Sequence, residues 1–401
     1  MKLLTLHIII LFLSISINTY SQINQTIEDF FRAENYYQTN KTDSAISILK
    51  KYKENEHYAI LLGKIYSEQN DYIKAIAVLK DYYKSYTSND VAFSLSQIYA
   101  QIGFEEEAIF WLEEYFNKNN KPLFYSQIIG NKEFTNIENT ESWKTFWNKN
   151  NYNKNYLPFE EALYLLKMQK YDEATTLLKS FPDNSFSYYK YYLMSKIYFD
   201  LEDYNLAYKN IKLSLENNKK FVEANYLKSE IEKITKKYEL ASAEIDYLLK
   251  QDTYNANNLY KKAEILYLTK NYAQAEIFVE KYLKNFSTNK EALFLKAKIN
   301  LELNRKELAI ICLNTLLIDG SLHKEYYELR GNILYDFGEW NLAKNDFSMS
   351  LDIDPQQGEM YYKSGICWLK MNQNEKACYN LKQAVQLRYQ KAQKDYYKNC
   401  E

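Results

Sequence analysis

The sequence predicts an all-α protein built as an array of about ten helical hairpins, and three observations support this. Apolar residues recur at three- and four-residue spacing, as in ALYLLKMQKYDEATTLLKSF (162–181), which is the period of an amphipathic helix. Eight Gly and four Pro in 401 residues are too few for a turn-rich β-protein. An alanine also recurs every 33 or 34 residues along most of the chain, a period typical of helical repeats.

The repeated unit has two small residues twelve positions apart. Alanine occupies the second position in ten units, at Ala45, Ala75, Ala108, Ala174, Ala207, Ala241, Ala275, Ala309, Ala343 and Ala377. The first position holds Ala33, Gly63, Ser96, Ala162, Ser195, Ser229, Ala263, Ala297, Gly331 and Gly365. We expect the two small residues to meet where the helices of a hairpin cross most closely, because larger side chains would push the helices apart.

With these two residues numbered 8 and 20, the 34-residue unit resembles the tetratricopeptide repeat (TPR). Tyr66, Tyr99 and Tyr198 occupy position 11, and position 17 holds Tyr72, Tyr171, Tyr204, Tyr238, Tyr272 and Trp340. Two departures are that only Pro355 supplies the proline at position 32 and that the first unit is short by about three residues. The resemblance implies a right-handed α-solenoid.

The N-terminus predicts export. Lys2 precedes an apolar run that ends at about Ile17, and the small residues Thr19 and Ser21 stand at the −3 and −1 positions before Gln22. This pattern is typical of a secretory signal peptide, here residues 1–21. The run is shorter than the ~20 residues of a spanning helix, so we expect no membrane span after signal removal. The expected location is periplasmic or extracellular, and the chain resembles exported bacterial TPR proteins.

The mature chain divides into four parts by its repeats. Residues 22–120 hold about three units, and 156–388 hold about seven. Between them, residues 121–155 carry Glu141 where an alanine would fall, which indicates a seam or degenerate repeat, with a dedicated binding insertion as the alternative. Residues 389–401 predict a capping helix, because the last unit of an array otherwise exposes its apolar face.

Charge and motifs point away from catalysis and nucleic acid. Lysine and arginine total 51 against 52 acidic residues, whereas nucleic-acid binders usually carry a basic excess. The mature chain has only His57 and His323, and no phosphate-binding or catalytic motif is present. We therefore expect neither an enzyme nor a cofactor or metal site. The stretch Gly331–Pro355, with two glycines and the carboxylates of DIDP, is interpreted as one hairpin.

The TPR resemblance implies that positions 2, 5, 9 and 12 of each first helix line a concave groove. The predicted partner-binding residues are Phe159, Tyr192, Lys196, Phe199, Tyr226, Glu230, Tyr260, Glu264, Tyr267, Phe294 and Lys298. Such a series of rings is suited to gripping an extended peptide, since rings bury much surface at low entropic cost. The alternative, that the rings pack against the next unit, stays open.

The predicted function is a non-enzymatic protein–protein interaction scaffold of the bacterial cell envelope, with a protein or peptide partner. Two alternatives remain: a glycan-binding module that uses the groove aromatics, and an accessory subunit of an envelope secretion or enzyme complex. Disulfides are permitted in an exported protein. Cys378 and Cys400 lie nearly symmetrically about Tyr389, so a disulfide there would staple the capping helix. By the family's positions, Cys367 and Cys378 are otherwise two small buried thiols.

Overall fold

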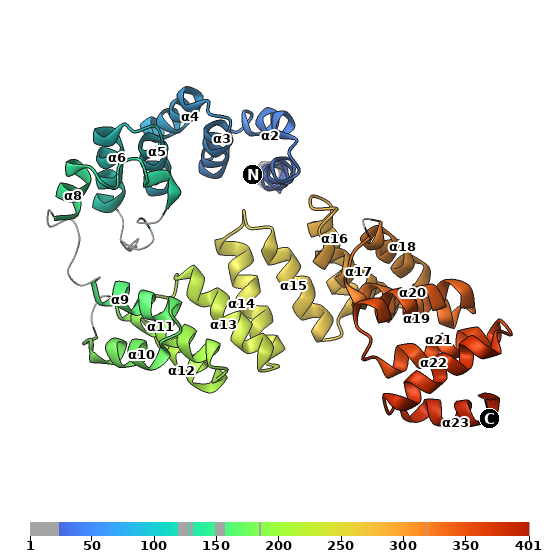
Figure 1. Cartoon of the computed structure of the whole chain (residues 1–401). Coiled ribbons are helices and arrows are strands. Elements are labelled where there is room, and N and C mark those ends of the chain that lie inside the picture. The colour runs from blue at the N-terminus through green and yellow to red at the C-terminus, as the bar shows by residue number, and fades with distance from the viewer. Residues whose placement is uncertain are drawn as a thin grey trace, which may run out of the picture. The chain divides into compact units, whose positions relative to one another are not determined.

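The computed structural model describes residues 24–118, 128, 131–148, 157–183, 186–318 and 320–400, and the predicted signal peptide lies outside them. Within these ranges all regular structure is helical, which confirms the predicted fold class (Figure 1). The helices form ten consecutive pairs, with η1 and α8 inserted after the third pair and α23 following the last. They are residues 24–38, α2 (Thr42–Leu49), α3 (Glu56–Glu68), α4 (Tyr72–Ser85), α5 (Asn89–Gln101), α6 (Glu105–Lys118), η1 (Lys132–Phe134), α8 (Glu141–Asn148), α9 (Leu157–Lys167), α10 (Tyr171–Ser180), α11 (Ser187–Asp200), α12 (Tyr204–Asn217), α13 (Val222–Ile234), α14 (Tyr238–Gln251), α15 (Asn257–Leu268), α16 (Tyr272–Leu283), α17 (Lys290–Glu302), α18 (Lys306–Leu317), α19 (Lys324–Asp336), α20 (Trp340–Ile353), α21 (Gly358–Lys370), α22 (Asn374–Gln386) and α23 (Gln390–Cys400).

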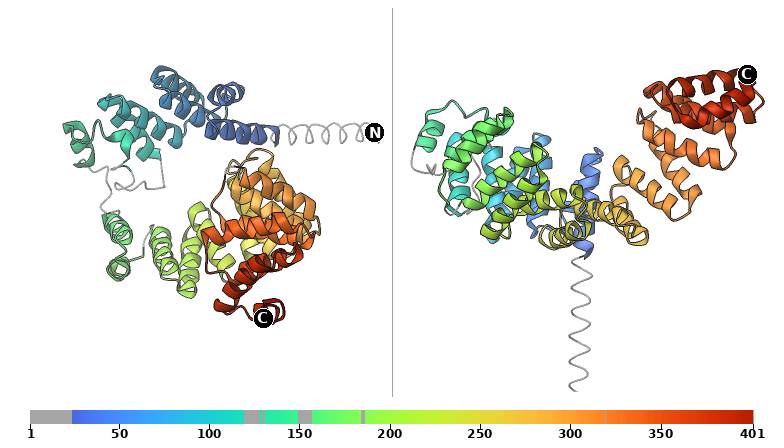
Figure 2. Two further views of the ribbon diagram at one scale, coloured as in Figure 1. Left: turned by 45° about the vertical axis from the view of Figure 1, so that its right-hand side comes forward. Right: turned by 90° about the horizontal axis from the view of Figure 1, so that it is seen from below.

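The chain separates into two compact units, Met1–Asn258 and Leu259–Glu401. Within each unit the helices of a pair lie side by side, as α11 and α12 do in the first unit and α21 and α22 in the second (Figure 2). Within each unit, successive helix pairs contact one another, as α4 with α5, α12 with α13 and α20 with α21 do, so packing there is between neighbours rather than around one central core.

Every hairpin turns through a left-handed residue at position 15. These residues are Asn40, Asn70, Gly103, Gln169, Glu202, Lys236, Lys270, Asn304, Gly338 and Asn372, with φ between 58° and 78°. In a typical turn, the Asp71 amide donates to the Tyr66 carbonyl at 2.8 Å. This six-to-one bond with a left-handed residue before it is the Schellman motif, which ends a helix and satisfies its last carbonyls.

The small residues of each hairpin are buried. All ten alanines at position 20 are at most 1% exposed, and position 24 holds an equally buried large side chain. In one hairpin the expected contact between positions 8 and 20 is present, since Ser195 Oγ donates to the Ala207 carbonyl at 2.8 Å. In the glycine hairpins the tight neighbour differs: a Cβ on Gly331 would lie 2.8 Å from Cε1 of Phe347, at position 24. There the small residue makes room for the large side chain.

The segment after the third pair is short and aromatic. Phe134, Trp143 and Phe146 are at most 2% exposed, and the rings of Phe134 and Trp143 lie 5.4 Å apart. Phe146 lies 6.0 Å from the ring of Phe116 on α6. The described residues of the segment therefore cover the end of the third hairpin.

The last hairpin is covered by α23, which contacts α22. Cys378 and Cys400 form a disulfide with a Cα–Cα distance of 5.5 Å, while Cys312 and Cys367 are buried free thiols. The disulfide therefore joins the capping helix to the tenth hairpin. Cys378 is only partly buried, unlike Cys367.

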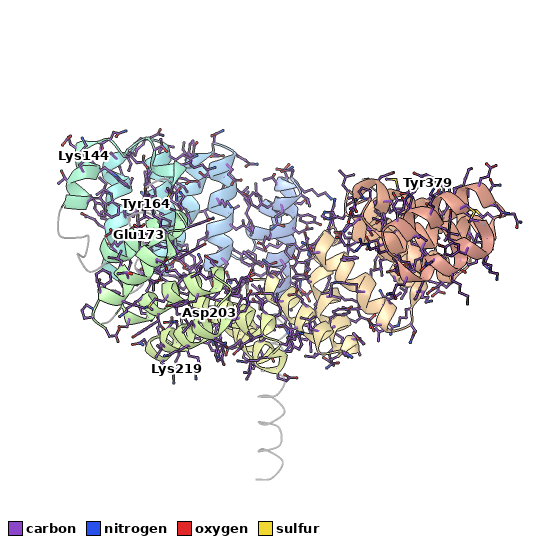
Figure 3. The ribbon with its side chains drawn as sticks, turned by 60° about the horizontal axis from the view of Figure 1, so that its bottom comes forward. Lys144, Tyr164, Glu173, Asp203, Lys219 and Tyr379 are labelled. Atoms are coloured by element: carbon purple, nitrogen blue, oxygen red, sulfur yellow. A yellow bond between two sulfur atoms is a disulfide. The ribbon has the colours of Figure 1, made fainter. Side chains whose placement is uncertain are left out.

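Charged side chains lie mostly on the outer surface of the helices. Lys144, Glu173, Asp203 and Lys219 are exposed examples (Figure 3). Many pair along a helix, as Lys144 does with Glu141 at 2.8 Å, and such exposed pairs add about 0–1 kcal/mol each. They solvate the array more than they stabilise it.

Candidate functional site

In the first unit, the aromatic residues at position 5 lie between consecutive hairpins. Phe159 is 3% exposed, and its ring centroid lies 5.7 Å from that of Tyr189 on α11. Tyr192 is partly buried, with its ring 5.0 Å from that of Phe221 at the start of α13. These two predicted site residues pack against the next hairpin, which is the alternative that the sequence leaves open.

Tyr226 is held by polar groups of the following turn. Its hydroxyl lies 2.9 Å from a carboxylate oxygen of Asp252 and 2.7 Å from Oδ1 of Asn258, and it accepts a bond from Asn255. Burial and the hydrogen bond to Asp252 raise the pKa of Tyr226 above its usual range. The side chain therefore has a structural role between two hairpins.

The other predicted residues of the first unit, at positions 9 and 12, differ in exposure. Lys196 is exposed, and Phe199 is partly buried with its ring 5.8 Å from that of Tyr204. Glu230 pairs with Lys233 on the same helix at 2.7 Å. Of these three residues, only Lys196 at position 9 is fully accessible.

In the second unit, three predicted residues come together on α15 and α17. Lys298 Nζ lies 4.8 Å from the ring centroid of Phe294 and 5.4 Å from that of Tyr267. All three side chains are partly buried. Burial lowers the pKa of Lys298, and the charge of nearby Glu264 counteracts this. We call Tyr267, Phe294 and Lys298 the α15–α17 cluster.

The position 5 rings of the second unit also contact their neighbours. Tyr260 lies 5.8 Å from the ring of Tyr282, and Phe294 lies 4.8 Å from that of Tyr326 on α19. Phe294 therefore supports the next hairpin on one side and Lys298 on the other. Where most first helices carry a ring, α19 carries Glu328, which accepts a hydrogen bond from Ser350 at 3.1 Å.

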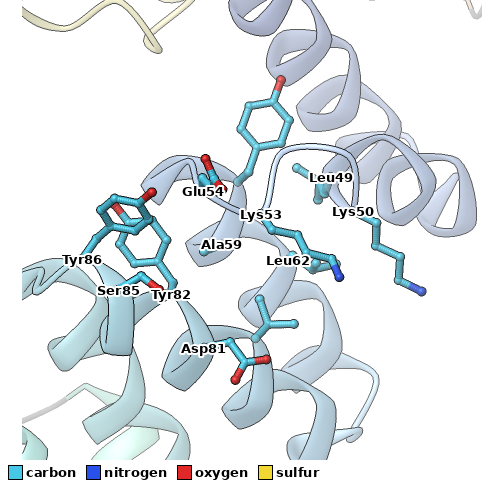
Figure 4. Close-up of a pocket in the computed structure, with 12 residues that line it drawn as sticks. Leu49, Lys50, Lys53, Glu54, Ala59, Leu62, Asp81, Tyr82, Ser85 and Tyr86 are labelled. Atoms are coloured by element: carbon cyan, nitrogen blue, oxygen red, sulfur yellow. The ribbon is translucent and has the colours of Figure 1, made fainter.

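A cavity that the sequence analysis missed lies between the first two hairpins (Figure 4). Its volume is about 490 Å³, within the range of ligand pockets. It is lined by Leu49, Lys50, Lys53, Glu54, Tyr58, Ala59, Leu62, Val78, Asp81, Tyr82, Ser85 and Tyr86. The one available signal was the shortness of the first unit.

The described residues provide neither a cluster of metal ligands nor a membrane-spanning helix. Among the described residues, no three His, Cys, Asp or Glu side chains are grouped so as to hold a metal ion. The Asp354 carboxylate of DIDP instead accepts from Lys324 at 2.5 Å and from the Gln356 amide at 3.0 Å. No helix in the described ranges is long and apolar enough to cross a membrane.

Comparison with known proteins gives structural likenesses only. No protein-family model and no curated protein matches the chain. YrrB, described as a TPR protein with an unusual peptide-binding site, is 20% identical over 45% of this chain and 93% of its own, with a TM-score of 0.39. A tetratricopeptide repeat protein from Parabacteroides merdae is 17% identical over 61% and 98%, with a TM-score of 0.47. PilF of Pseudomonas aeruginosa is 15% identical over 53% and 96%, with a TM-score of 0.45. The chain's own paired helices make it an all-α, TPR-like array.

Proposed function

We propose that the chain is a non-enzymatic scaffold of the bacterial cell envelope that binds a peptide segment or a partner protein on its first helices. The α15–α17 cluster carries this proposal, because a partly buried cation lies there between two aromatic rings. Such a group offers both apolar contact and a positive charge to an incoming side chain. Aromatic residues that flank a charge are also frequent at the energetic centres of interfaces.

Export is part of the same proposal and rests on two supports. The first is the apolar segment at residues 1–21, which has the composition of a signal peptide. The second is the disulfide between Cys378 and Cys400, since disulfides persist in oxidising compartments such as the periplasm.

A site-specific cross-link tests the binding face. A photoreactive amino acid replaces Tyr267. In a matched variant it replaces Tyr379, an exposed tyrosine on α22, the second helix of the last hairpin (Figure 3). In intact cells we expect a discrete protein adduct at Tyr267 and none at Tyr379. Equal labelling at both positions would overturn the proposed face, and an adduct of carbohydrate alone would favour the glycan-binding alternative.

A charge reversal then tests the role of the cation. Lys298→Glu removes the positive charge between the rings, and we expect it to weaken the captured complex about tenfold or more. Lys290→Glu, at an exposed position of the same helix, is the matched control and should leave the complex unchanged. Circular dichroism of both variants checks that the helices persist. Unchanged binding in Lys298→Glu would exclude this residue from the site.

A further inference from the structure

The cavity of the first unit arises because one helix is short. The second helix α2 ends four residues after its repeat alanine, Ala45, whereas α4 ends ten residues after Ala75. The missing turns would have lain against α4, as the last turns of α4 lie against α6. Leu49, Tyr58 and Leu62 remain as a buried apolar floor, at most 4% exposed.

The next interface along the chain shows what normally fills this space. There the last turns of α4 supply Tyr83, whose ring lies 4.9 Å from that of Trp111 on α6. The Tyr83 hydroxyl also donates to Glu114 at 2.7 Å. The residue of α4 that corresponds to Trp111 is Val78, three residues after the repeat alanine, and it lines the cavity.

The residue that corresponds to Tyr83 is Lys53, which stands eight residues after Ala45, outside the helix, and is exposed. Position 28 is a large apolar residue in most later hairpins: Tyr83, Phe116, Leu215, Leu249, Leu283, Leu317, Leu351 and Val385. The interface is thus shaped for a helical turn with an apolar side chain, and the first hairpin does not provide one.

The rim of the cavity favours a negatively charged neighbour. Lys50 and Lys53 lie together on one side, opposite Tyr82 and Tyr86, whose rings are 5.2 Å apart (Figure 4). In the described part of the chain, neither lysine forms an ion pair. Of the acidic rim residues, Asp81 already pairs with Lys84 at 3.4 Å. The remaining charges of the rim are one negative, on Glu54, and two positive, on Lys50 and Lys53.

We propose that this cavity binds one helical turn of a partner protein, which inserts a leucine- or phenylalanine-sized side chain with an acidic residue beside it. The inserted turn replaces the one that α2 lacks and packs against Val78 and Tyr82, which are partly buried and line the cavity, while its carboxylate pairs with Lys50 or Lys53. The site is separate from the α15–α17 cluster and does not depend on the function proposed for it.

Peptide binding to the full mature chain tests the proposal. The probe is a fluorescent peptide with the sequence of residues 105–118, EEEAIFWLEEYFNK, which is an acidic second helix of this same chain. We expect saturable binding by the wild-type protein. The same peptide with Tyr115→Ser and Phe116→Ser should bind about tenfold more weakly or not at all, because it lacks the two rings of its last turn, which include Phe116 at position 28.

Two protein variants locate the bound peptide. Val78→Asp places a negative charge in the cavity wall that faces the inserted apolar side chain, so it should abolish binding. The double change Lys50→Glu with Lys53→Glu affects only exposed side chains and should weaken binding about tenfold. Lys51→Glu, an exposed lysine that does not line the cavity, is the matched control and should bind as the wild type does.

Each result decides the proposal. Thermal unfolding followed by circular dichroism shows whether Val78→Asp is folded, and the lysine variants supply the answer if it is not. Absence of saturable binding by the wild type, or equal binding by the Lys50/Lys53 and Lys51 variants, would overturn the proposal. Cross-linking at Tyr267 should be the same in all these variants, so failure here is distinguishable from failure of the proposed scaffold function.

Discussion

A Cβ atom added to Gly331 would lie 2.8 Å from Cε1 of Phe347, a side chain with no exposed surface. Gly331→Ala therefore forces a buried ring to move, at a cost of about 1–3 kcal/mol, while the gain in helix propensity is about 1 kcal/mol. We expect a net loss of about 1 kcal/mol of unfolding free energy, measured by urea denaturation. If the contact with Phe347 causes the loss, Gly331→Ala should lower the unfolding free energy less in a Phe347→Leu protein than in the wild type. A Gly331→Ala protein as stable as the wild type would show that Phe347 has room to shift.

The left-handed turns predict a stabilising substitution. Lys270 adopts φ 61°, which costs a residue with a side chain about 1–2 kcal/mol. Glycine has no such cost but loses more backbone entropy on folding, about 0.5–1 kcal/mol. Lys270→Gly should therefore raise the unfolding free energy by about 0.5 kcal/mol and raise the melting temperature.

The control for this substitution is another lysine at a helix end. Lys284 has φ −54°, an ordinary right-handed conformation, so Lys284→Gly should lower the melting temperature. The conformational argument is refuted if both substitutions change stability in the same direction.

A buried carboxyl group predicts a pH dependence of stability. Glu232 on α13 has no exposed surface, and no well-formed hydrogen bond reaches its carboxylate oxygens, although the nearby Tyr208 hydroxyl weakly favours the charged form. Lys228 Nζ lies 3.7 Å away but also pairs with Glu244. Desolvation raises the pKa of Glu232 above 4.5, and the charges of Lys228 and Lys237 only partly offset this, while Glu244 adds to the rise.

The sign follows from proton linkage. Because the folded-state pKa is above the unfolded value, the folded protein retains a proton that the unfolded chain releases. The stabilising effect of that proton is complete below about pH 4.5 and is lost as pH rises through the folded-state pKa. Glu232→Gln removes this titration, so the wild type should lose stability relative to the variant between about pH 4.5 and pH 7 in urea denaturation. A difference that is constant with pH would show that folding leaves the pKa of Glu232 unchanged.

The disulfide predicts a localised loss of stability. Cys378 and Cys400 are 22 residues apart, and a cross-link over a loop of this size contributes about 3 kcal/mol. In Cys400→Ser we expect α23 to detach readily, with faster trypsin cleavage after Lys391 and Lys394 and little change in cleavage of the other helices. Mass spectrometry of non-reduced peptides should show Cys378 joined to Cys400 in the wild type. Free thiols at both positions in the wild type, or trypsin cleavage of the wild type as fast as that of Cys400→Ser, would contradict this prediction.

The hairpins could be predicted from the sequence because their signal is local and repeated. In ten units, a small residue is followed twelve positions later by an alanine, as Gly331 is by Ala343. This spacing indicates where the two helices of a hairpin cross. A close contact of this kind tolerates few side chains. The aromatic residue at position 5 carries no comparable information, because a ring suits an exposed groove and an interface between hairpins equally well.

What decides between those two roles is the neighbouring hairpin. Phe221 covers Tyr192, and three polar side chains of one turn hold the hydroxyl of Tyr226. Phe221 lies 29 residues after Tyr192, and the partners of Tyr226 lie 26 to 32 residues after it. No periodicity in the sequence identifies them. The α15–α17 cluster and the cavity beside Lys53 also depend on side-chain directions and on where one helix ends. The sequence shows that the first unit is short, but it does not show that the missing turns of α2 leave a cavity.

The left-handed residue at position 15 ends every first helix at the same register, in all ten hairpins. The two helices of each hairpin are therefore joined by the same kind of turn. A whole period can be duplicated or excised between equivalent turns, for example from Lys236 to Lys270, with the junctions on either side preserved. The reach of such a protein is consequently free to change in steps of one repeat during evolution, without redesign of its ends.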